Sequence, residues 1–257
     1  MRDFDHAVAQ RYEFRHNDLW LREHSESVWG LIQEAQARSR DAPGELNQLF
    51  LGQFFEGDLQ RWTEFLAFIA GRTVLDIGGG PLPVMAFWPL AGRRIVLDPL
   101  ASEYSRSATN VTGRSWFDDF TVIDQPAEQF IPSLRGGVEG AIICRNALDH
   151  TSEPYLILSN IASYASPGCR LLLWTDLHHV GARDAGHSDI TKDRDGFARL
   201  IENIGFDIET ETPPYDGRGT IEFGCVAIKR RPGVPVSPVH LQDISSLAPR
   251  DAGSLDS

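Results

Sequence analysis

A turn of three consecutive glycines is the part of the sequence best suited to binding a ligand. A short apolar run that contains Asp76 ends in Gly78, Gly79 and Gly80. Because glycine has no side chain, a ligand can approach the backbone of such a turn closely, and its N–H groups can bind polar or anionic groups. A glycine turn alone is as compatible with a structural bend as with a site, so its meaning depends on its neighbours.

Polar side chains follow three further apolar runs, each at the point where the run ends. Asp98 ends the second run, where a carboxylate can accept both hydroxyls of a ribose. The residues from 124 to 128 follow the third run, and those from 145 to 150 follow the fourth. The carboxyl ends of neighbouring strands border the binding crevice of an open α/β sheet. Four consecutive strand ends with suitable groups favour a binding site over a bare turn.

Strands and helices must alternate if they are to bring these residues together, and the sequence from residue 73 onward has that pattern. Helices are predicted over residues 154–165 and 193–204, and the second has one apolar face followed by Gly205. Continuous apolar strands alternating with helices predict a parallel sheet covered on both faces. The last two strands are joined by residues 213–219, too few for a helix, which predicts an antiparallel hairpin at the sheet edge. The predicted strands are residues 73–77, 94–97, 121–123, 140–144, 170–174, 206–210 and 221–229.

Three regions are predicted along the chain. Residues 1–70 have helical periodicity and many aromatic side chains, and they are expected to form a helical N-terminal cap. The aromatic rings could cover a ligand pocket, although docking of the cap onto the core is the commoner role. Residues 71–231 are expected to form the sheet domain. Residues 232–257 are rich in Pro, Ser and Asp without periodicity, which predicts a mobile tail.

Together these motifs resemble the class I S-adenosylmethionine-dependent methyltransferases over about residues 73–230. The run from Val74 to Gly80 is similar to the family's first motif, and Asn146 to Pro154 is similar to its N-x-L-[ED]-H-x-x-[DE]-P segment. The lead into the fifth strand resembles L-x-P-G-G-x-L-L, with Cys169 in place of the second glycine. The resemblance implies a Rossmann-like α/β fold with a mostly parallel seven-stranded sheet, a C-terminal antiparallel hairpin and the N-terminal helical cap.

The resemblance also implies S-adenosylmethionine as the cofactor. The glycine loop, with Gly78, Gly79, Gly80 and the preceding Asp76, is expected to hold the amino-acid end of this molecule. A nicotinamide dinucleotide is not expected, because the Asp76 carboxylate would repel a pyrophosphate but suits an ammonium group.

At the other end of the cofactor, the expected contacts involve the second, third and fourth strands. Asp98 is similar to the family's ribose-binding acid. Two registers are open for the adenine, at Asp124-Gln125 or at Ala127-Glu128, and the family's A-E step favours the second. The cofactor contacts predicted after these three strands are Asp98, Pro99, Ala127, Glu128 and Asn146.

Four histidines are candidates for the chemistry of methyl transfer. Transfer from a sulfonium is an in-line displacement at carbon, so a hydroxyl acceptor gains from a base, and histidine has a suitable pKa. His178 and His179 follow the fifth predicted strand and are the first candidates, with His150 next and His187 behind them. A polar loop residue is the commoner role for any single histidine, but their shared location predicts at least one functional histidine.

No metal site is predicted. Side chains after the fifth strand could supply nitrogen and oxygen ligands, but their spacing matches no fixed metal motif. The three cysteines have no CxxC spacing, which excludes zinc and iron–sulfur sites built on cysteine. The potential ligands after the fifth strand are Asp176, His178, His179, His187 and Asp189.

Charge and hydropathy indicate which classes of partner the protein can have. The formal charge of −12 and the lack of a basic patch argue against nucleic acid. No apolar run is long enough to span a bilayer, and no secretory signal is recognised at Met1, so a cytoplasmic protein without membrane contact is expected. The sequence leaves open whether the chain forms a homo-oligomer.

The predicted function is O-methylation of a small metabolite or sugar hydroxyl. The alternatives are N-methylation of a small molecule, or a catalytically silent protein that binds cofactor or a partner.

Overall fold

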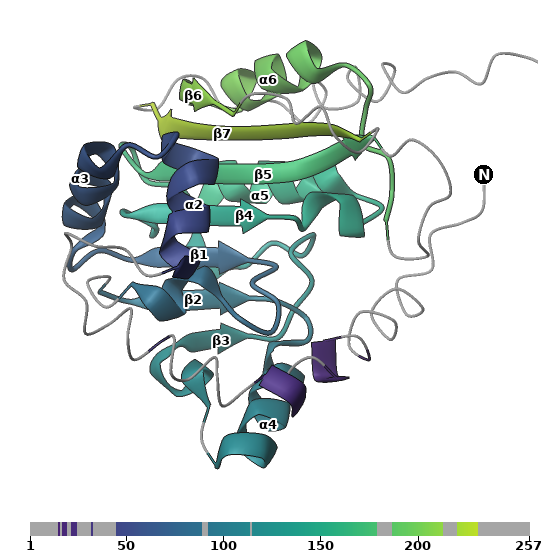
Figure 1. Cartoon of the computed structure of the whole chain (residues 1–257). Coiled ribbons are helices and arrows are strands. Elements are labelled where there is room, and N and C mark those ends of the chain that lie inside the picture. Colours follow the sequence, from purple (N-terminus) through teal and green to yellow (C-terminus); the bar gives the residue numbers. More distant parts are fainter. Residues whose placement is uncertain are drawn as a thin grey trace, which may run out of the picture.

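The structure is a computed structural model that describes residues 15, 17–19, 22–24, 32, 45–88, 92–113, 115–178, 187–212 and 220–230. Within these residues a seven-stranded sheet lies between two layers of helices (Figure 1). In the same part of the chain, no helix combines the length and the apolar character that crossing a membrane requires. His179, the loop of residues 213–219 and the predicted tail lie outside the described residues.

The sheet has the order β3-β2-β1-β4-β5-β7-β6. The first five strands are parallel to one another, and β7 is antiparallel to both of its neighbours, β5 and β6. The mostly parallel seven-stranded sheet with an antiparallel end that the sequence predicts is therefore confirmed. The strands are β1 (Val74–Ile77), β2 (Arg94–Leu97), β3 (Thr121–Ile123), β4 (Ala141–Arg145), β5 (Arg170–His178), β6 (Phe206–Glu211) and β7 (Ile221–Lys229).

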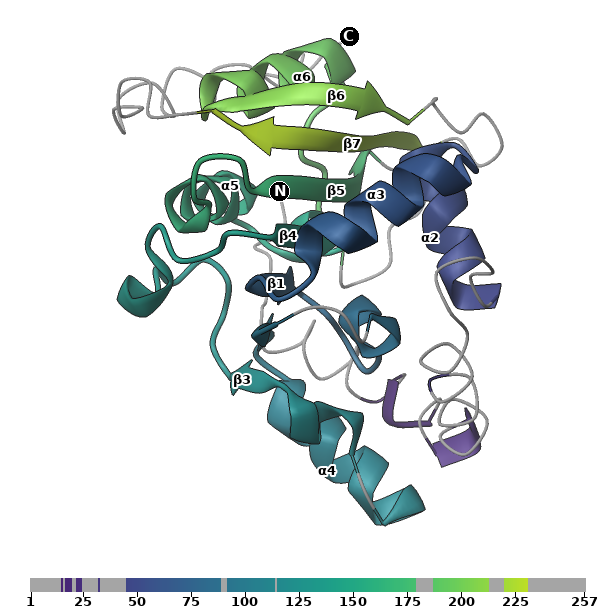
Figure 2. The ribbon, with the colours of Figure 1, turned by 90° about the vertical axis from the view of Figure 1, so that its left-hand side faces the viewer.

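Helices cover both faces of this sheet, as continuous apolar strands require. Figures 1 and 2 show α2 (Glu45–Phe55) and α3 (Leu59–Ile69) on one face and α5 (Pro154–Tyr164) on the other. Among the elements whose bounds are described, α4 (Ala101–Thr112) lies beside β3 and α6 (Arg194–Asn203) lies beside β6. Single turns of 3-10 helix are η1 (Val84–Phe87), η2 (Trp116–Asp119), η3 (Pro132–Leu134) and η4 (Leu148–His150).

Local sequence signals account for most of these helices. Asp58 begins α3 and accepts hydrogen bonds from two backbone N–H groups of its first turn, at 2.8 and 3.1 Å, while Asp193 caps α6 through the N–H of Gly196 at 2.7 Å. The helix α4 was not predicted from the sequence. Its buried stripe consists only of Ala101, Tyr104 and Ala108, which is too weak an apolar pattern to indicate a helix.

The fifth strand is longer than the sequence predicts. It continues from Trp174 to His178, whereas the prediction placed this stretch in a loop after the strand. Thr175 and Leu177 are fully buried and alternate with less buried residues, and β7 pairs with the extension as far as His178, with a shift in register between Asp176 and His178. The prediction ended too early because Thr175-Asp176 breaks the apolar run, although a half-buried strand needs only alternate apolar positions.

The aromatic residues of α2 and α3 belong to the core of the sheet domain. Phe50, Phe54, Phe55, Trp62 and Phe65 are buried in one cluster with side chains of β1, β2, β4, β5 and β7. The docking interpretation therefore holds for these rings. The boundary at residue 70 and the role of the residues before α2 stay predictions.

The packing of α3 on the sheet can be tested by replacing Trp62 with alanine. Trp62 is 1% exposed, and its ring lies 5.6 Å from that of Phe55 and 5.9 Å from that of Trp88. We expect the free energy of unfolding, measured by urea denaturation of the full chain, to fall by about 3–5 kcal/mol. Leu59→Ala on the same helix is the control, because Leu59 is 49% exposed and its loss should cost less than about 0.5 kcal/mol. An unchanged midpoint for Trp62→Ala would mean that α3 is not part of the cooperative core.

Candidate functional site

A cavity lies at the carboxyl ends of β1, β2 and β4. The chain crosses over at this point, because β2 lies on one side of β1 and β4 on the other. Such a switch in strand order is where open α/β sheets form their binding crevice. Most of the predicted cofactor contacts line the cavity, namely Gly78, Asp98, Pro99, Ala127, Glu128 and Asn146. His150 lines it as well.

Gly78 brings the loop after β1 against the loop after β4. Its φ is +65°, a left-handed conformation that favours glycine, and a Cβ atom added there would lie 2.5 Å from the Cβ of Ala147. Its N–H donates to the carbonyl oxygen of Leu97 at 2.9 Å, which continues the pairing of β1 with β2. A residue with a side chain would therefore be disfavoured at position 78 both by the backbone conformation and by the contact with Ala147. Gly78 also forms part of the cavity wall.

Asp98 connects the glycine loop with the loop after β2. One carboxylate oxygen accepts a hydrogen bond from the N–H of Gly80 at 2.9 Å, and the other accepts from the N–H of Leu100 at 2.8 Å. The side chain lines the cavity although the residue is only 6% exposed. Each carboxylate oxygen has two lone pairs, so Asp98 retains capacity to accept hydrogen bonds from a ligand.

Asp76 is buried behind the glycine loop and bonds to the backbone that follows this loop. It is 2% exposed, is not among the residues that line the cavity, and accepts a hydrogen bond from the N–H of Val84 at 3.1 Å. Burial, together with the nearby charge of Asp98, raises the pKa of Asp76 from 3.8 to about 7, although the Val84 hydrogen bond and Arg145 act in the opposite direction. Gly79 and Gly80 are also absent from the cavity lining.

The two registers considered for the adenine differ clearly in position. Asp124 accepts hydrogen bonds from the N–H of Ser102, at 2.8 Å, and from its hydroxyl, so its carboxylate holds the start of α4. Ala127 and Glu128 line the cavity, whereas Asp124 and Gln125 do not. The Asn160 side chain of α5 holds this segment by donating to the carbonyl oxygens of Ala127 and Glu128, at 2.8 and 3.1 Å.

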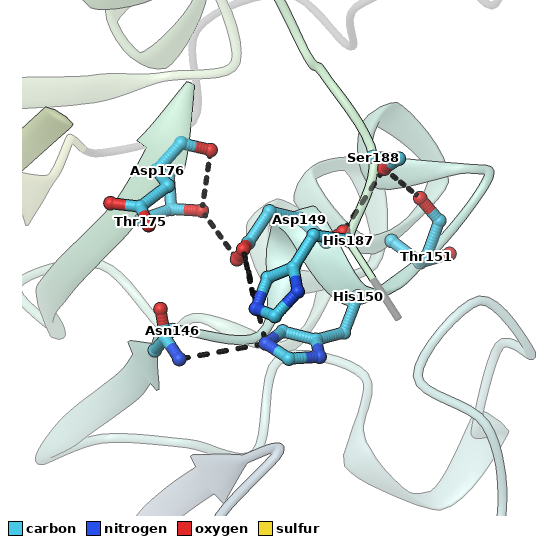
Figure 3. Close-up of polar contacts among 8 residues, drawn as sticks. All are labelled: Asn146, Asp149, His150, Thr151, Thr175, Asp176, His187 and Ser188. Carbon is cyan, nitrogen blue, oxygen red and sulfur yellow. Dashed lines mark hydrogen bonds and ion pairs between the residues drawn. The ribbon is translucent and has the colours of Figure 1, made fainter. Parts of the chain in front are cut away.

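Asn146 has a left-handed backbone conformation at the end of β4. Its φ is +52°, which is uncommon for a residue other than glycine, and its N–H donates to the carbonyl oxygen of Trp174 at 2.7 Å. The Asn146 amide nitrogen lies 3.5 Å from Nε2 of His150, so both side chains meet at the cavity wall (Figure 3).

His150 belongs to a cluster that the sequence analysis did not assemble. Nε2 of His150 and Nε2 of His187 each lie 3.8 Å from Oδ2 of the fully buried Asp149, and the two rings are 4.3 Å apart (Figure 3). The sequence contained one indication that Asp149 belongs to a site, because Asp149 is part of the methyltransferase-like segment that begins at Asn146. Its proximity to His187 had no signal in the sequence, because the two residues are far apart along the chain.

The first catalytic candidates lie elsewhere. Nδ1 of His178 is 3.0 Å from a carboxylate oxygen of Asp189, and His178 is not among the residues that line the cavity. His179 lies outside the described residues. The structure therefore places the third candidate, His150, at the cavity in preference to His178.

No protein-family model and no curated protein matches this chain. It is similar to the solved structure of a SAM-dependent methyltransferase from Aquifex aeolicus, with 19% identity, coverage of 77% of this chain and 96% of the other, and a TM-score of 0.47. It is also similar to a variant of the 16S rRNA (adenine(1408)-N(1))-methyltransferase from Catenulisporales acidiphilia with its cosubstrate SAM, with 13% identity, coverage of 68% and 93%, and a TM-score of 0.45. Similarity at this level carries no residue role or substrate from one chain to the other.

The raised pKa of Asp76 predicts a pH-dependent stability. The folded protein holds this proton more tightly than the unfolded chain, so the stabilisation is complete below pH 3.8 and is lost as the pH rises to about 7. Relative to Asp76→Asn, the wild-type free energy of unfolding should therefore fall by up to about 4 kcal/mol between pH 4 and pH 7. Urea denaturation over this range measures it. Glu139→Gln, at an exposed position, is the control and should follow the wild type at every pH. A pH-independent difference between wild type and Asp76→Asn would contradict the raised pKa.

Proposed function

We propose that the chain is an S-adenosylmethionine-dependent methyltransferase and that the cavity beside β1 binds the cofactor. The observation that carries this proposal is the convergence of Gly78, Asp98, Glu128 and Asn146 on one cavity at the switch point of the sheet. These residues come from the ends of four separate strands, and their types suit the parts of a nucleoside linked to an amino acid.

The cavity residues suit the two ends of this cofactor. Asp98 is an acceptor for ribose hydroxyls, and Ala127 with Glu128 forms the wall for the adenine. Gly78 belongs to the loop that is expected to hold the amino-acid end, and Asn146 lines the same cavity. When bound, the cofactor supplies a methyl group on a positively charged sulfur. The buried Asp98 carboxylate near the glycine loop favours a cationic ligand over a pyrophosphate, while Asp76, whose pKa is raised to about 7, contributes only part of a negative charge at neutral pH.

We propose a hydroxyl on a small metabolite or sugar as the acceptor, with His150 as the histidine that acts on it. His150 is the predicted catalytic histidine that lines the cavity, next to Asn146. It can act either as the base that accepts the hydroxyl proton or through a cation bound beside it. The formal charge of −12 supports a small acceptor over nucleic acid, whose phosphates it would repel.

Calorimetry with S-adenosylhomocysteine tests the cofactor. The full chain should bind it, and Asp98→Ala should weaken binding by about 1–3 kcal/mol, because hydrogen bonds to a carboxylate are lost. Asp124→Ala is the matched control, since Asp124 ends the neighbouring strand but lies outside the cavity lining. Circular dichroism of each variant checks folding. Binding of NADH without binding of S-adenosylhomocysteine would overturn the proposal.

A panel of small hydroxyl compounds with radiolabelled cofactor tests the acceptor and the histidine. On any compound that the wild type methylates, His150→Ala should lower turnover by about 10²–10⁴-fold with little change in cofactor affinity. His178→Ala should stay near the wild type, because His178 pairs with Asp189 outside the cavity lining. The assignment of His150 is wrong if His178→Ala loses turnover and His150→Ala does not. Transfer only to amines would replace the hydroxyl by the N-methylation alternative.

A further inference from the structure

The cluster of Asp149, His150 and His187 has the composition of a metal site. Each residue offers one ligand atom, and these atoms all lie within 4.8 Å of one another. Both imidazole Nε2 atoms are 3.8 Å from the same carboxylate oxygen. This distance is too long for hydrogen bonds, which need about 2.7–3.2 Å between the heavy atoms. In a tetrahedral site with bonds of about 2.0–2.2 Å the ligand atoms are about 3.3–3.6 Å apart, so a small inward movement would close the site.

The cluster is held in place by contacts outside it. The N–H of Ser188 donates to the carbonyl oxygen of Asp149 at 2.6 Å, and its hydroxyl donates to that of Thr151 at 2.7 Å. These bonds hold the segment of His187 against η4, which carries the other two ligands. The hydroxyl of Thr175 donates to Oδ1 of Asp149 at 3.3 Å, which turns the second oxygen, Oδ2, toward the two rings (Figure 3). Outer contacts of this kind orient ligands in metal sites.

We infer that Asp149, His150 and His187 bind one divalent transition-metal ion. Two imidazoles and one carboxylate suit Zn²⁺, Co²⁺, Mn²⁺ or Fe²⁺, whereas Mg²⁺ and Ca²⁺ prefer oxygen ligands. Three protein ligands leave coordination positions open, as in catalytic metal sites. The sequence analysis predicted no metal, and the ligands that it considered after the fifth strand share only His187 with this set.

One of the three proposed ligands faces the cavity, and a catalytic role for the ion rests on the proposed function. His150 lines the same cavity as Asn146 and Asp98. An acceptor hydroxyl that coordinates the ion loses its proton to solvent more readily, because a bound cation lowers the pKa of a coordinated oxygen. The oxygen then forms a bond to the methyl carbon while the carbon–sulfur bond breaks and its electron pair stays on sulfur. The products are a methyl ether, S-adenosylhomocysteine and a proton. In this arrangement His150 holds the ion and is not the base.

Titration of the tag-free full chain with Co²⁺ and Zn²⁺, after treatment with a chelator, tests the site. One ion per chain should bind, Co²⁺ should give the visible absorption of a nitrogen-ligated ion, and Mg²⁺ should not compete at equal concentration. His187→Ala should weaken Co²⁺ binding by about 100-fold or more. His178→Ala is the matched control and should bind like the wild type, because His178 lies in the separate pair with Asp189. Calorimetry with S-adenosylhomocysteine should give the same affinity for both variants.

The outcomes separate the two proposals. If the wild type binds S-adenosylhomocysteine but no Co²⁺ or Zn²⁺, or if His187→Ala binds Co²⁺ as well as the wild type, the metal site is wrong and the proposed function stands. If Co²⁺ binds and His187→Ala abolishes it while S-adenosylhomocysteine does not bind, the metal site stands and the proposed function is wrong. If the wild type binds metal but its turnover is unchanged after a chelator removes the metal, the ion is not needed for catalysis and His150 acts as the base.

Discussion

The close approach of Gly78 to Ala147 is the contact on which the cavity depends. The strands β1 and β4 are neighbours, so the loops that follow them leave the same edge of the sheet side by side. These loops can meet only because Gly78 has no Cβ, which would lie 2.5 Å from that of Ala147. Asn146, His150 and Asp98 line the same cavity beside this meeting point. A larger residue at Gly78 would separate the two sides, and the proposed cofactor and acceptor would lose their common site.

Three buried carboxylates at this edge set its electrostatic character. Asp76, Asp98 and Asp149 are 2%, 6% and 0% exposed. A buried carboxylate is costly unless donors or positive charge compensate it. Backbone N–H groups serve Asp76 and Asp98, while the Thr175 hydroxyl and two imidazoles surround Asp149. The carboxylates of Asp98 and Asp149 favour cationic ligands, which suits both a sulfonium cofactor and a metal ion, whereas Asp76, whose pKa is raised to about 7, is partly protonated at neutral pH.

The two helical layers support different parts of the site. On the face of α2 and α3, the side-chain oxygen of Gln53 accepts a hydrogen bond from Arg145 at 2.9 Å. The positive charge of Arg145 in turn favours the ionised form of Asp76 and lowers its pKa. On the opposite face, Asn160 of α5 holds the segment that contains Ala127 and Glu128. The aromatic rings of α2 and α3 are thus structural. They pack one helical layer onto the sheet, and none of them is among the residues that line the cavity.

The sequence by itself determined the sheet, its antiparallel end and the strand ends that carry the site, because apolar periodicity and glycine turns are local patterns. It also singled out Gly78, Asp98 and Asn146, whose types suit ligand binding at the carboxyl ends of neighbouring strands. Only the tertiary structure decided between residues close together in the chain, such as Asp124, which holds α4, and Ala127, which lines the cavity. A shift of a few residues along a loop reverses which side chain faces a cavity, and a local pattern does not record that direction.

The same limit applies to the histidines. His178 and His150 are equally good candidates by residue type, but β5 continues through His178 and its side chain pairs with Asp189, whereas η4 places His150 at the cavity. His187 joins Asp149 because hydrogen bonds from Ser188 tie two distant segments together. Such a cluster depends on three-dimensional contacts between side chains far apart in the chain, so no spacing in the sequence could show it.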